Sequence, residues 1–404
     1  MCIVLCIILS CFFVTFSSGQ AVKINDVGRA PDIVVDHNGD VHAIYMVSHI
    51  YKYRKIGRDG TIGPEIDVGF GLERDDSTRS YGEIVVDSKN QPHIFSGPGY
   101  ATLPTDATEM QKITLGKRDN SITIDSKDKI LIIYRGTEAG EYSGPGMIQG
   151  QIKESGDSDF GQVMNLDENY QGRNRNVYCA AMAGPDDKFH VILRHGPDNS
   201  IYYLESADGT TWGEGEQISG VNLGEAPRIV VTPKNRILMC DMDGLVKEKM
   251  GPGNWVSRGH PVEGEDRKPS SLATDKLGNV YISSIGGQVA VLKDGENTWS
   301  TKIVLEHAGT EAFTYVATGA DGCTYVIYEG ENDEIYVVRV GMDGKIAKFD
   351  SPVNMIRDLT SDAIPNRNKW TIGITPVQNE IVLFGPNGLN GSSIYKLNGK
   401  LRSR

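Results

Sequence analysis

The sequence predicts an all-β fold: a single β-propeller of four-stranded antiparallel blades. A pair of short β-rich strands joined by a polar turn of four or five residues recurs eight times. The first strands of these pairs end 38 to 58 residues apart, and a period of about 40–50 residues with several strands per unit is typical of propellers. Glycine supplies 47 of the 404 residues, which indicates many turns and few long helices.

The eight repeated hairpins predict a closed ring of blades. They span residues 33–45, 84–95, 122–134, 180–193, 229–240, 271–282, 315–328 and 372–384. Each unit must bury both of its faces against neighbouring units, and a closed ring achieves this. We predict eight blades; the short 38-residue interval before the third hairpin leaves seven as the alternative.

The last unit has room for only two strands after its turn, around Ile381–Phe384 and Ser393–Leu397. We therefore expect Ala21–Asp26 to supply its outer strand.

The N-terminus predicts secretion. Residues 1–19 are uncharged and almost all apolar, and they end in small residues at 17–19. This pattern is typical of a signal peptide followed by an extracellular or periplasmic domain, here 20–404. Only the α-amino group is positive in this segment, so an uncleaved N-terminal anchor remains an alternative. A lipoprotein site at Cys11 is disfavoured, because the apolar run continues after it.

Charge and cysteine content narrow the function classes. The 53 acidic and 41 basic residues give a net charge of −12, which argues against a general nucleic-acid binder. Cys179, Cys240 and Cys323 remain after the signal segment. They are too few for a disulfide framework, so we expect buried free thiols and at most one disulfide. No zinc or cofactor motif is present, and we expect a monomer with no contact to a membrane beyond the signal segment.

Two features of the repeat have a structural interpretation. Asp36–Asp40 resembles part of a calcium loop, but the same place in other units holds ordinary hairpin-turn residues. We therefore predict turns capped by Asp and Asn side chains, with a structural calcium ion as the alternative. Trp212, Trp255 and Trp299 recur at similar places in their units. We predict that they fill the core between blades; platforms for sugars are the alternative.

One stretch resembles a known family. Ser206–Trp212 reads S-A-D-G-T-T-W and resembles the Asp-box turn of sialidases and other propellers, one residue short. The surrounding stretch, residues 118–216, includes this turn and also contains a Y-R-G segment at 134–136, an S-G-P-G segment at 143–146, then Tyr178, Arg194 and a Tyr pair at 202–203. Together these resemble the BNR-4 repeat family of secreted propellers, which is similar to ulvan lyases and related enzymes that cut rhamnose–uronate linkages in acidic polysaccharides.

The resemblance implies a site for β-elimination. Such cleavage needs a cation to neutralise the uronate carboxylate, a base to remove the C5 proton and an acid for the leaving oxygen. Tyr178 matches the family's base or acid, and Arg194 matches the arginine that holds the carboxylate. Tyr178 precedes the first strand of its hairpin, and Arg194 follows the second strand. Both are therefore expected at the same end of the hairpin, at one mouth of the ring. The predicted substrate-binding residues are Arg135, in the same phase one unit earlier, with Tyr134, Arg175 and His195.

Departures from the family keep other functions open. The histidines expected from an upstream blade are absent at 80–81 and 97–100, so His49 is offered as an auxiliary catalytic acid or base. The main alternative is a non-catalytic carbohydrate- or protein-binding propeller. A sialidase-like hydrolase is a minor alternative, suggested by Arg29-Ala30-Pro31, but the arginine triad of sialidases is not assembled. His42, His93 and His190 lie within strands, and we expect them to be structural.

Overall fold

The computed structural model describes residues 21–403 with internal gaps. The gaps are 26–28, 48–49, 58–60, 72–81, 97–98, 116–117, 137–146, 167–178, 196–199, 222–227, 242, 263–268, 285–286, 306–313, 319–323, 330–334, 341–345, 350–370, 375–380, 387–391 and 398–400. The predicted signal segment, 1–19, lies outside the described residues. Within those residues, no helix is long and apolar enough to cross a membrane.

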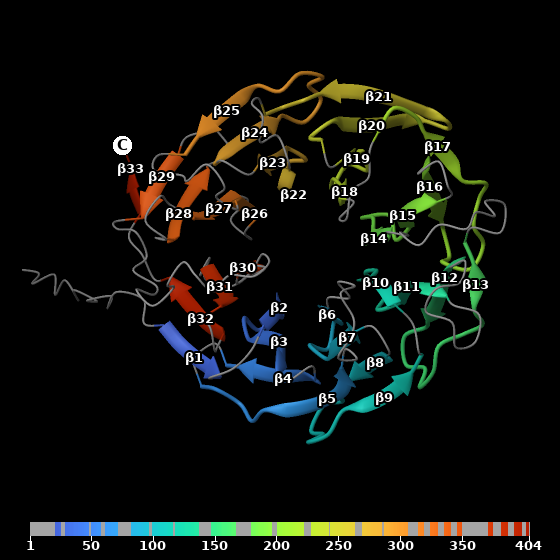
Figure 1. The fold of residues 1–404 in the computed structure, drawn as a ribbon, viewed down its shortest axis with the longest axis vertical. Coiled ribbons are helices and arrows are strands. Elements are labelled where there is room, and N and C mark those ends of the chain that lie inside the picture. Colours follow the sequence, from blue (N-terminus) through green and yellow to red (C-terminus); the bar gives the residue numbers. More distant parts are fainter. Residues whose placement is uncertain are drawn as a thin grey trace, which may run out of the picture.

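The described strands form eight antiparallel sheets arranged as a ring (Figure 1). The first four are β2 to β5 (Arg29–Val35, Val41–Val47, Ile50–Ile56, Ile66–Gly71), β6 to β9 (Glu83–Val86, Pro92–Ser96, Gly99–Thr102, Gln111–Thr114), β10 to β13 (Arg118–Ile124, Ile130–Gly136, Met147–Lys153, Met164–Asn165) and β14 to β17 (Cys179–Ala183, Phe189–His195, Ser200–Ser206, Glu216–Ile218). The next two are β18 to β21 (Arg228–Val231, Ile237–Cys240, Val246–Gly251, Asn254–Gly259) and β22 to β25 (Pro269–Thr274, Val280–Ser284, Gln288–Leu292, Thr301–Val304). The last two are β26 to β29 (Thr314–Thr318, Thr324–Glu329, Ile335–Val340, Ile346–Phe349) with β33 (Leu401–Ser403), and β30 to β32 (Thr371–Ile374, Ile381–Pro386, Ser392–Leu397) with β1 (Ala21–Asn25).

The sheets confirm the predicted propeller fold. Each repeated hairpin forms the first two strands of one sheet, and the first strand, such as β14, lies nearer the centre of the ring than the fourth, such as β17 (Figure 1). The two closely spaced hairpins belong to different sheets, β6 to β9 and β10 to β13. The short interval therefore does not arise from two hairpins that share one sheet.

The ring is closed by the N-terminal strand, as the sequence predicts. β1 pairs antiparallel with β32, and Ala21 lies opposite Tyr395. β1 thus becomes the outer strand of the sheet that contains the last three repeat strands. A second connection was not predicted: β33 pairs with β29, with Leu401 opposite Phe349. This pairing gives the sheet of β26 to β29 a fifth strand.

The hydrophobic core lies between successive sheets. On β11, Leu131 and Ile133 pack toward β15, whereas Ile132 packs on the opposite face toward the sheet of β6 to β9. Both faces are covered, so β7 and β23 are buried at every residue instead of alternating with polar positions. The three predicted core tryptophans are partly buried against these clusters, which confirms their structural role: Trp212, Trp255 and Trp299.

The hairpin turns are capped by their own side chains, as predicted. The Asp36 carboxylate accepts the backbone N–H groups of Asn38 and Asp40, both at 2.9 Å. Asp87, Asp125, Asp241 and Asp275 cap the corresponding turns in the same way. Among the described residues, no group of His, Cys, Asp or Glu side chains is placed to hold a metal ion. The hydrogen bonds from the turn N–H groups make these five aspartates turn caps.

Cys179 and Cys240, the two cysteines that the structure describes, do not form a disulfide with each other. Cys179 is half-buried and Cys240 is fully buried. Burial raises the pKa of the Cys240 thiol well above its usual value. Cys323 lies outside the described residues.

Candidate functional site

Three of the predicted site residues, Arg135, Arg194 and His195, lie toward one face of the ring. The Ser126 N–H donates to the Asp187 carboxylate at 3.1 Å, so the turns that precede β11 and β15 lie side by side. We call the face that carries these hairpin turns the turn face. Since β11 and β15 both start there, both end on the opposite face, which we call the strand-end face. Figure 1 shows the two strands in neighbouring sheets.

Two predicted arginines occupy equivalent places at the strand-end face. Arg135 is the last but one residue of β11, and Arg194 is the last but one residue of β15. His195 ends β15, and Arg118, which sequence reasoning missed, lies opposite Arg135 in the register of β10 and β11. Arg194 is half-buried. The backbone therefore brings three arginine positions and one histidine position to the same end of two adjacent sheets.

Three predicted residues lie outside the described part of the chain: Tyr178, Arg175 and His49. β14 begins at Cys179, which lies opposite Leu193, the residue before Arg194. Their roles stay predictions.

Tyr134 corrects one prediction. Its side chain is 0% exposed, and its hydroxyl donates to Gln151 Oε1 at 2.7 Å. The ring packs edge-on against Phe95, with centroids 6.2 Å apart. Burial raises the pKa of Tyr134 to about 12. The residue is a core side chain between two sheets, so the prediction that it contacts substrate is wrong.

The strand histidines are structural, as predicted. Each is buried, and its Nδ1 lies within hydrogen-bond distance of a tyrosine hydroxyl on the next strand: His42 with Tyr53 at 2.8 Å, His93 with Tyr100 at 2.6 Å and His190 with Tyr203 at 2.7 Å. The other imidazole nitrogen of His42, Nε2, lies 3.1 Å from the carboxylate of the turn cap Asp36. These side chains fasten the second strand to the third and are not open to a ligand.

The fourth hairpin departs from this pattern. Gly184 occupies the place that Asp36 holds in the first hairpin, and His190 Nε2 is buried without a hydrogen-bond partner. Burial lowers the pKa of His190. The Tyr203 hydroxyl also lies 2.7 Å from Glu205 Oε2 and donates to it. With Tyr203 as that donor, the neutral imidazole carries its proton on Nδ1 and leaves Nε2 as an unmatched acceptor.

The turn at 206–212 is capped by the side chain of Asp208. Asp208 Oδ1 accepts the N–H groups of Thr211 at 2.7 Å and Thr210 at 2.8 Å. These bonds hold the pKa of Asp208 well below its usual value. The Trp212 Nε1–H donates to the carbonyl of Gly209 at 3.0 Å, and its ring packs between two sheets. Such a turn stabilises the fold and does not by itself indicate an activity.

A pocket that the sequence did not predict lies between the sheets of β14 to β17 and β18 to β21. It has a volume of about 280 Å³. One wall comes from β16 and from the segment that leads into β17, and the other comes from β20 and the turn after it. The lining residues are Tyr203, Glu205, Gly213, Glu214, Glu216, Lys249, Gly251 and Pro252. β16 runs away from Ser200, which pairs with His195. The pocket therefore lies toward the turn face, remote from the strand-end arginines.

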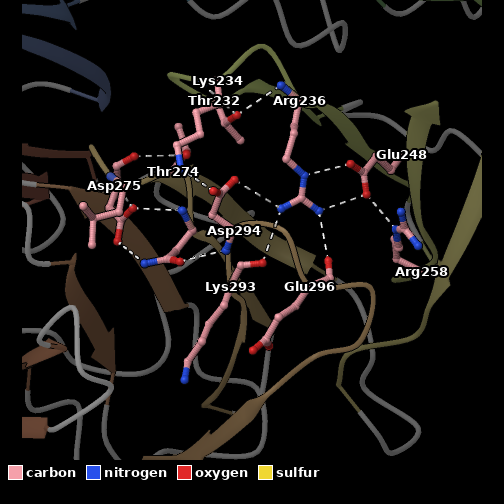
Figure 2. Close-up of polar contacts among 12 residues, drawn as sticks. Thr232, Lys234, Arg236, Glu248, Arg258, Thr274, Asp275, Lys293, Asp294 and Glu296 are labelled. Atoms are coloured by element: carbon pink, nitrogen blue, oxygen red, sulfur yellow. Dashed lines mark hydrogen bonds and ion pairs between the residues drawn. The ribbon is translucent and has the colours of Figure 1, made fainter. Parts of the chain in front are cut away.

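A second polar cluster joins the sheets of β18 to β21 and β22 to β25 (Figure 2). Glu248 accepts from Arg236 Nε at 2.8 Å and Nη2 at 3.0 Å, and from Arg258 Nε at 2.6 Å. Figure 2 shows Arg236 reaching on to the backbone carbonyls of Lys293 and Glu296, in the turn that follows β24 of the next sheet. Both carboxylate oxygens of Glu248 are used within the protein. This cluster fastens two sheets together and offers no site to a ligand.

The chain was compared with protein-family models, curated proteins and solved structures. No family model and no curated protein matches the sequence. Among solved structures, the chain is similar to the WD40 beta propeller domain of Doa1, with 15% sequence identity, a TM-score of 0.47, and coverage of 80% of this chain and 95% of that chain. The pairing and arrangement of its own sheets therefore identify the chain as an all-β propeller.

Proposed function

We propose that this propeller binds an anionic, uronate-containing polysaccharide at the strand-end face of sheets β10 to β13 and β14 to β17. The observation that carries the proposal is the equivalent placement of Arg135 and Arg194 at the ends of β11 and β15. A guanidinium holds a carboxylate through two parallel hydrogen bonds. Two such positions on adjacent sheets suit a polymer that carries carboxylates in series. The resemblance of residues 118–216 to the BNR-4 repeat family points to the same ligand class.

The charge of the protein makes the local arginines necessary for this ligand. The chain carries a net charge of −12, and acidic caps such as Asp36 and Asp125 occupy the turn face. A polyanion is therefore repelled by the molecule as a whole and needs a local group of cations. Such binding weakens as salt screens the charges.

Cleavage by β-elimination is the second candidate, and the hairpin of β14 and β15 favours it. β14 begins opposite the residue before Arg194, and Tyr178 precedes β14 in the sequence. In this reaction Arg194 would hold the uronate carboxylate, and deprotonated Tyr178 would take the C5 proton. The bond to the leaving oxygen breaks, that oxygen takes up a proton, and a carbon–carbon double bond forms.

Calorimetric titration with a uronate oligosaccharide from ulvan tests binding. We expect Arg194→Ala and Arg135→Ala each to weaken binding by about tenfold, because each removes a charge-assisted contact. Arg54→Ala is the matched control: Arg54 lies opposite Ala43 near the turn-face end of β4, where it pairs with Glu65 at 3.6 Å. Equal affinity of all three variants and the unchanged protein, or no binding at all, would overturn the proposal.

Ultraviolet absorbance of the unsaturated uronate product tests cleavage in the same samples. A rise that Tyr178→Phe abolishes while binding is retained would establish a lyase. Binding with a flat trace would restrict the function to recognition.

A further inference from the structure

The pocket between β16 and β20 has a hydrogen-bonding character that points to a ligand class. It is walled by two sheets and lies away from the strand-end arginines. Gly213 and Gly251 line it, and no atom lies within 4 Å of the position that a Cβ would take at either glycine. The hollow is therefore open at these two glycines, and its volume of about 280 Å³ suits a small ligand.

The hydrogen-bond donors of the pocket are already used. Lys249 Nζ donates to Glu216 Oε1 at 2.6 Å, to Glu216 Oε2 at 2.7 Å and to the Gly251 carbonyl at 3.3 Å. A lysine ammonium has three N–H donors, so this set is complete. The Tyr203 hydroxyl has one proton and donates it to Glu205. The lining side chains have no further N–H or O–H group to offer.

Acceptors and negative charge remain in excess. A carboxylate has about four lone-pair directions, and three carboxylates line the pocket: Glu205, Glu214 and Glu216. Against them stands a single lining cation, Lys249, so the lining carries a net charge of −2. Lys188 adds only a distant contact, 3.8 Å from Glu205 Oε1. A ligand for this pocket must bring both donors and positive charge.

Tyr203 forms one wall of the pocket, and its ring is already in contact with Lys249. Tyr203 is 1% exposed and is fixed by Trp255, whose ring centroid lies 5.3 Å away, edge to face. Lys249 Nζ lies 5.0 Å from the centroid of the Tyr203 ring, in a cation–π contact. Trp255 Nε1 also donates to Glu216 at 3.3 Å, which makes its fluorescence a reporter of changes at that carboxylate.

From these observations we infer that the pocket lined by Tyr203, Glu205, Glu216 and Lys249 binds a small organic cation through a guanidinium or primary ammonium group. The carboxylates accept its N–H groups, and the closed donor set disfavours anions and ligands that mainly accept hydrogen bonds. The inference is independent of polysaccharide binding, since it concerns another face of the ring and a ligand of opposite charge.

N-acetyl-arginine amide and its uncharged isostere N-acetyl-citrulline amide provide the test with the full chain. Calorimetry measures affinity. The chain has four tryptophans, so a fluorescence change is assigned to Trp255 by its loss in Trp255→Phe. We expect saturable binding of the arginine compound, a fluorescence change, and at least about tenfold weaker binding of the citrulline compound, because only the former carries charge. Equal binding of the two compounds, or no binding of either, would overturn the inference.

Variants place the ligand in this pocket. We expect Glu216→Gln and Glu214→Gln each to weaken binding of the arginine compound by about fivefold or more. Glu109→Gln, at an exposed carboxylate between β8 and β9, should leave affinity unchanged. Glu214 is exposed, so its variant remains informative if Glu216→Gln disturbs the fold. Binding that survives both pocket variants unchanged would contradict the assignment.

Discussion

Removing the carboxylate of Glu248 is expected to destabilise the ring strongly. Its side chain is 4% exposed, and those of its partners Arg236 and Arg258 are 15% and 7% exposed. Glu248→Leu removes three charge-assisted hydrogen bonds and leaves two guanidinium groups without their carboxylate. Breaking a buried pair in this way costs about 3–5 kcal/mol. Arg236 keeps two backbone carbonyls as partners, so we expect the lower end of that range, about 3 kcal/mol.

Denaturant unfolding followed by tryptophan fluorescence measures this loss, and two controls test its cause. The triple variant Arg236→Met, Glu248→Leu and Arg258→Met replaces these three charges with apolar groups and leaves Asp294 paired with Lys234. We expect its stability to lie within about 1 kcal/mol of the unchanged protein. Glu154→Gln removes a carboxylate that is 54% exposed and paired with Lys129, and should cost less than about 0.5 kcal/mol. A loss below about 1 kcal/mol for Glu248→Leu alone would refute the reasoning.

The same carboxylate predicts a dependence on pH. Burial alone would raise the pKa of Glu248, but the hydrogen bonds and charges of Arg236 and Arg258 outweigh it, so the pKa lies below its usual 4.5. The contribution of Glu248 to stability is therefore complete above pH 4.5 and is lost as the pH falls through the lower pKa of the folded state. The difference between the unchanged protein and Glu248→Gln should shrink over that acidic range.

Three further predictions concern a buried histidine, a capped turn and the thiols. Burial lowers the pKa of His190 below its usual 6.5, so stability should fall as the pH drops below that value. Scanning calorimetry should show a smaller fall in His190→Gln, whose side chain does not titrate, and an equal fall would contradict this prediction. Asp208→Ala removes a turn cap and should cost about 1 kcal/mol in chemical unfolding, whereas an unchanged midpoint would show that the cap is dispensable. Native alkylation followed by mass spectrometry should label half-buried Cys179 faster than Cys240, because burial keeps the latter a thiol; faster labelling of Cys240 would contradict its burial.

Much of the fold could be predicted because its signals are local. Each hairpin carries its own strand pattern and its own turn residues, as at Asp36. The room for only two strands after the last turn predicted that Ala21–Asp26 supplies the outer strand, and β1 does so over Ala21–Asn25. The pairing of β33 with β29 could not be predicted, because three residues carry no usable pattern. Tyr134 directly continues the apolar run of residues 130–133, and both faces of this strand are covered, so the run itself places Tyr134 in the core.

The pocket could not be found from the sequence because its parts are distant in the chain. Tyr203 and Glu205 lie on β16 and Lys249 lies on β20, and only the packing of two sheets brings them together. The strand-end arginines were easier to predict, since Arg135 and Arg194 hold equivalent places in repeated hairpins. Arg118 was missed because it is recognised only from its register opposite Arg135.

Amide hydrogen exchange with and without a uronate oligosaccharide locates the ligand on the ring. We predict slower exchange in peptides that contain the ends of β11 and β15, around Arg135 and Arg194, and unchanged exchange around Lys249 in β20. Protection confined to the turn face or to the pocket, or no protection in the presence of saturating oligosaccharide, would contradict this prediction.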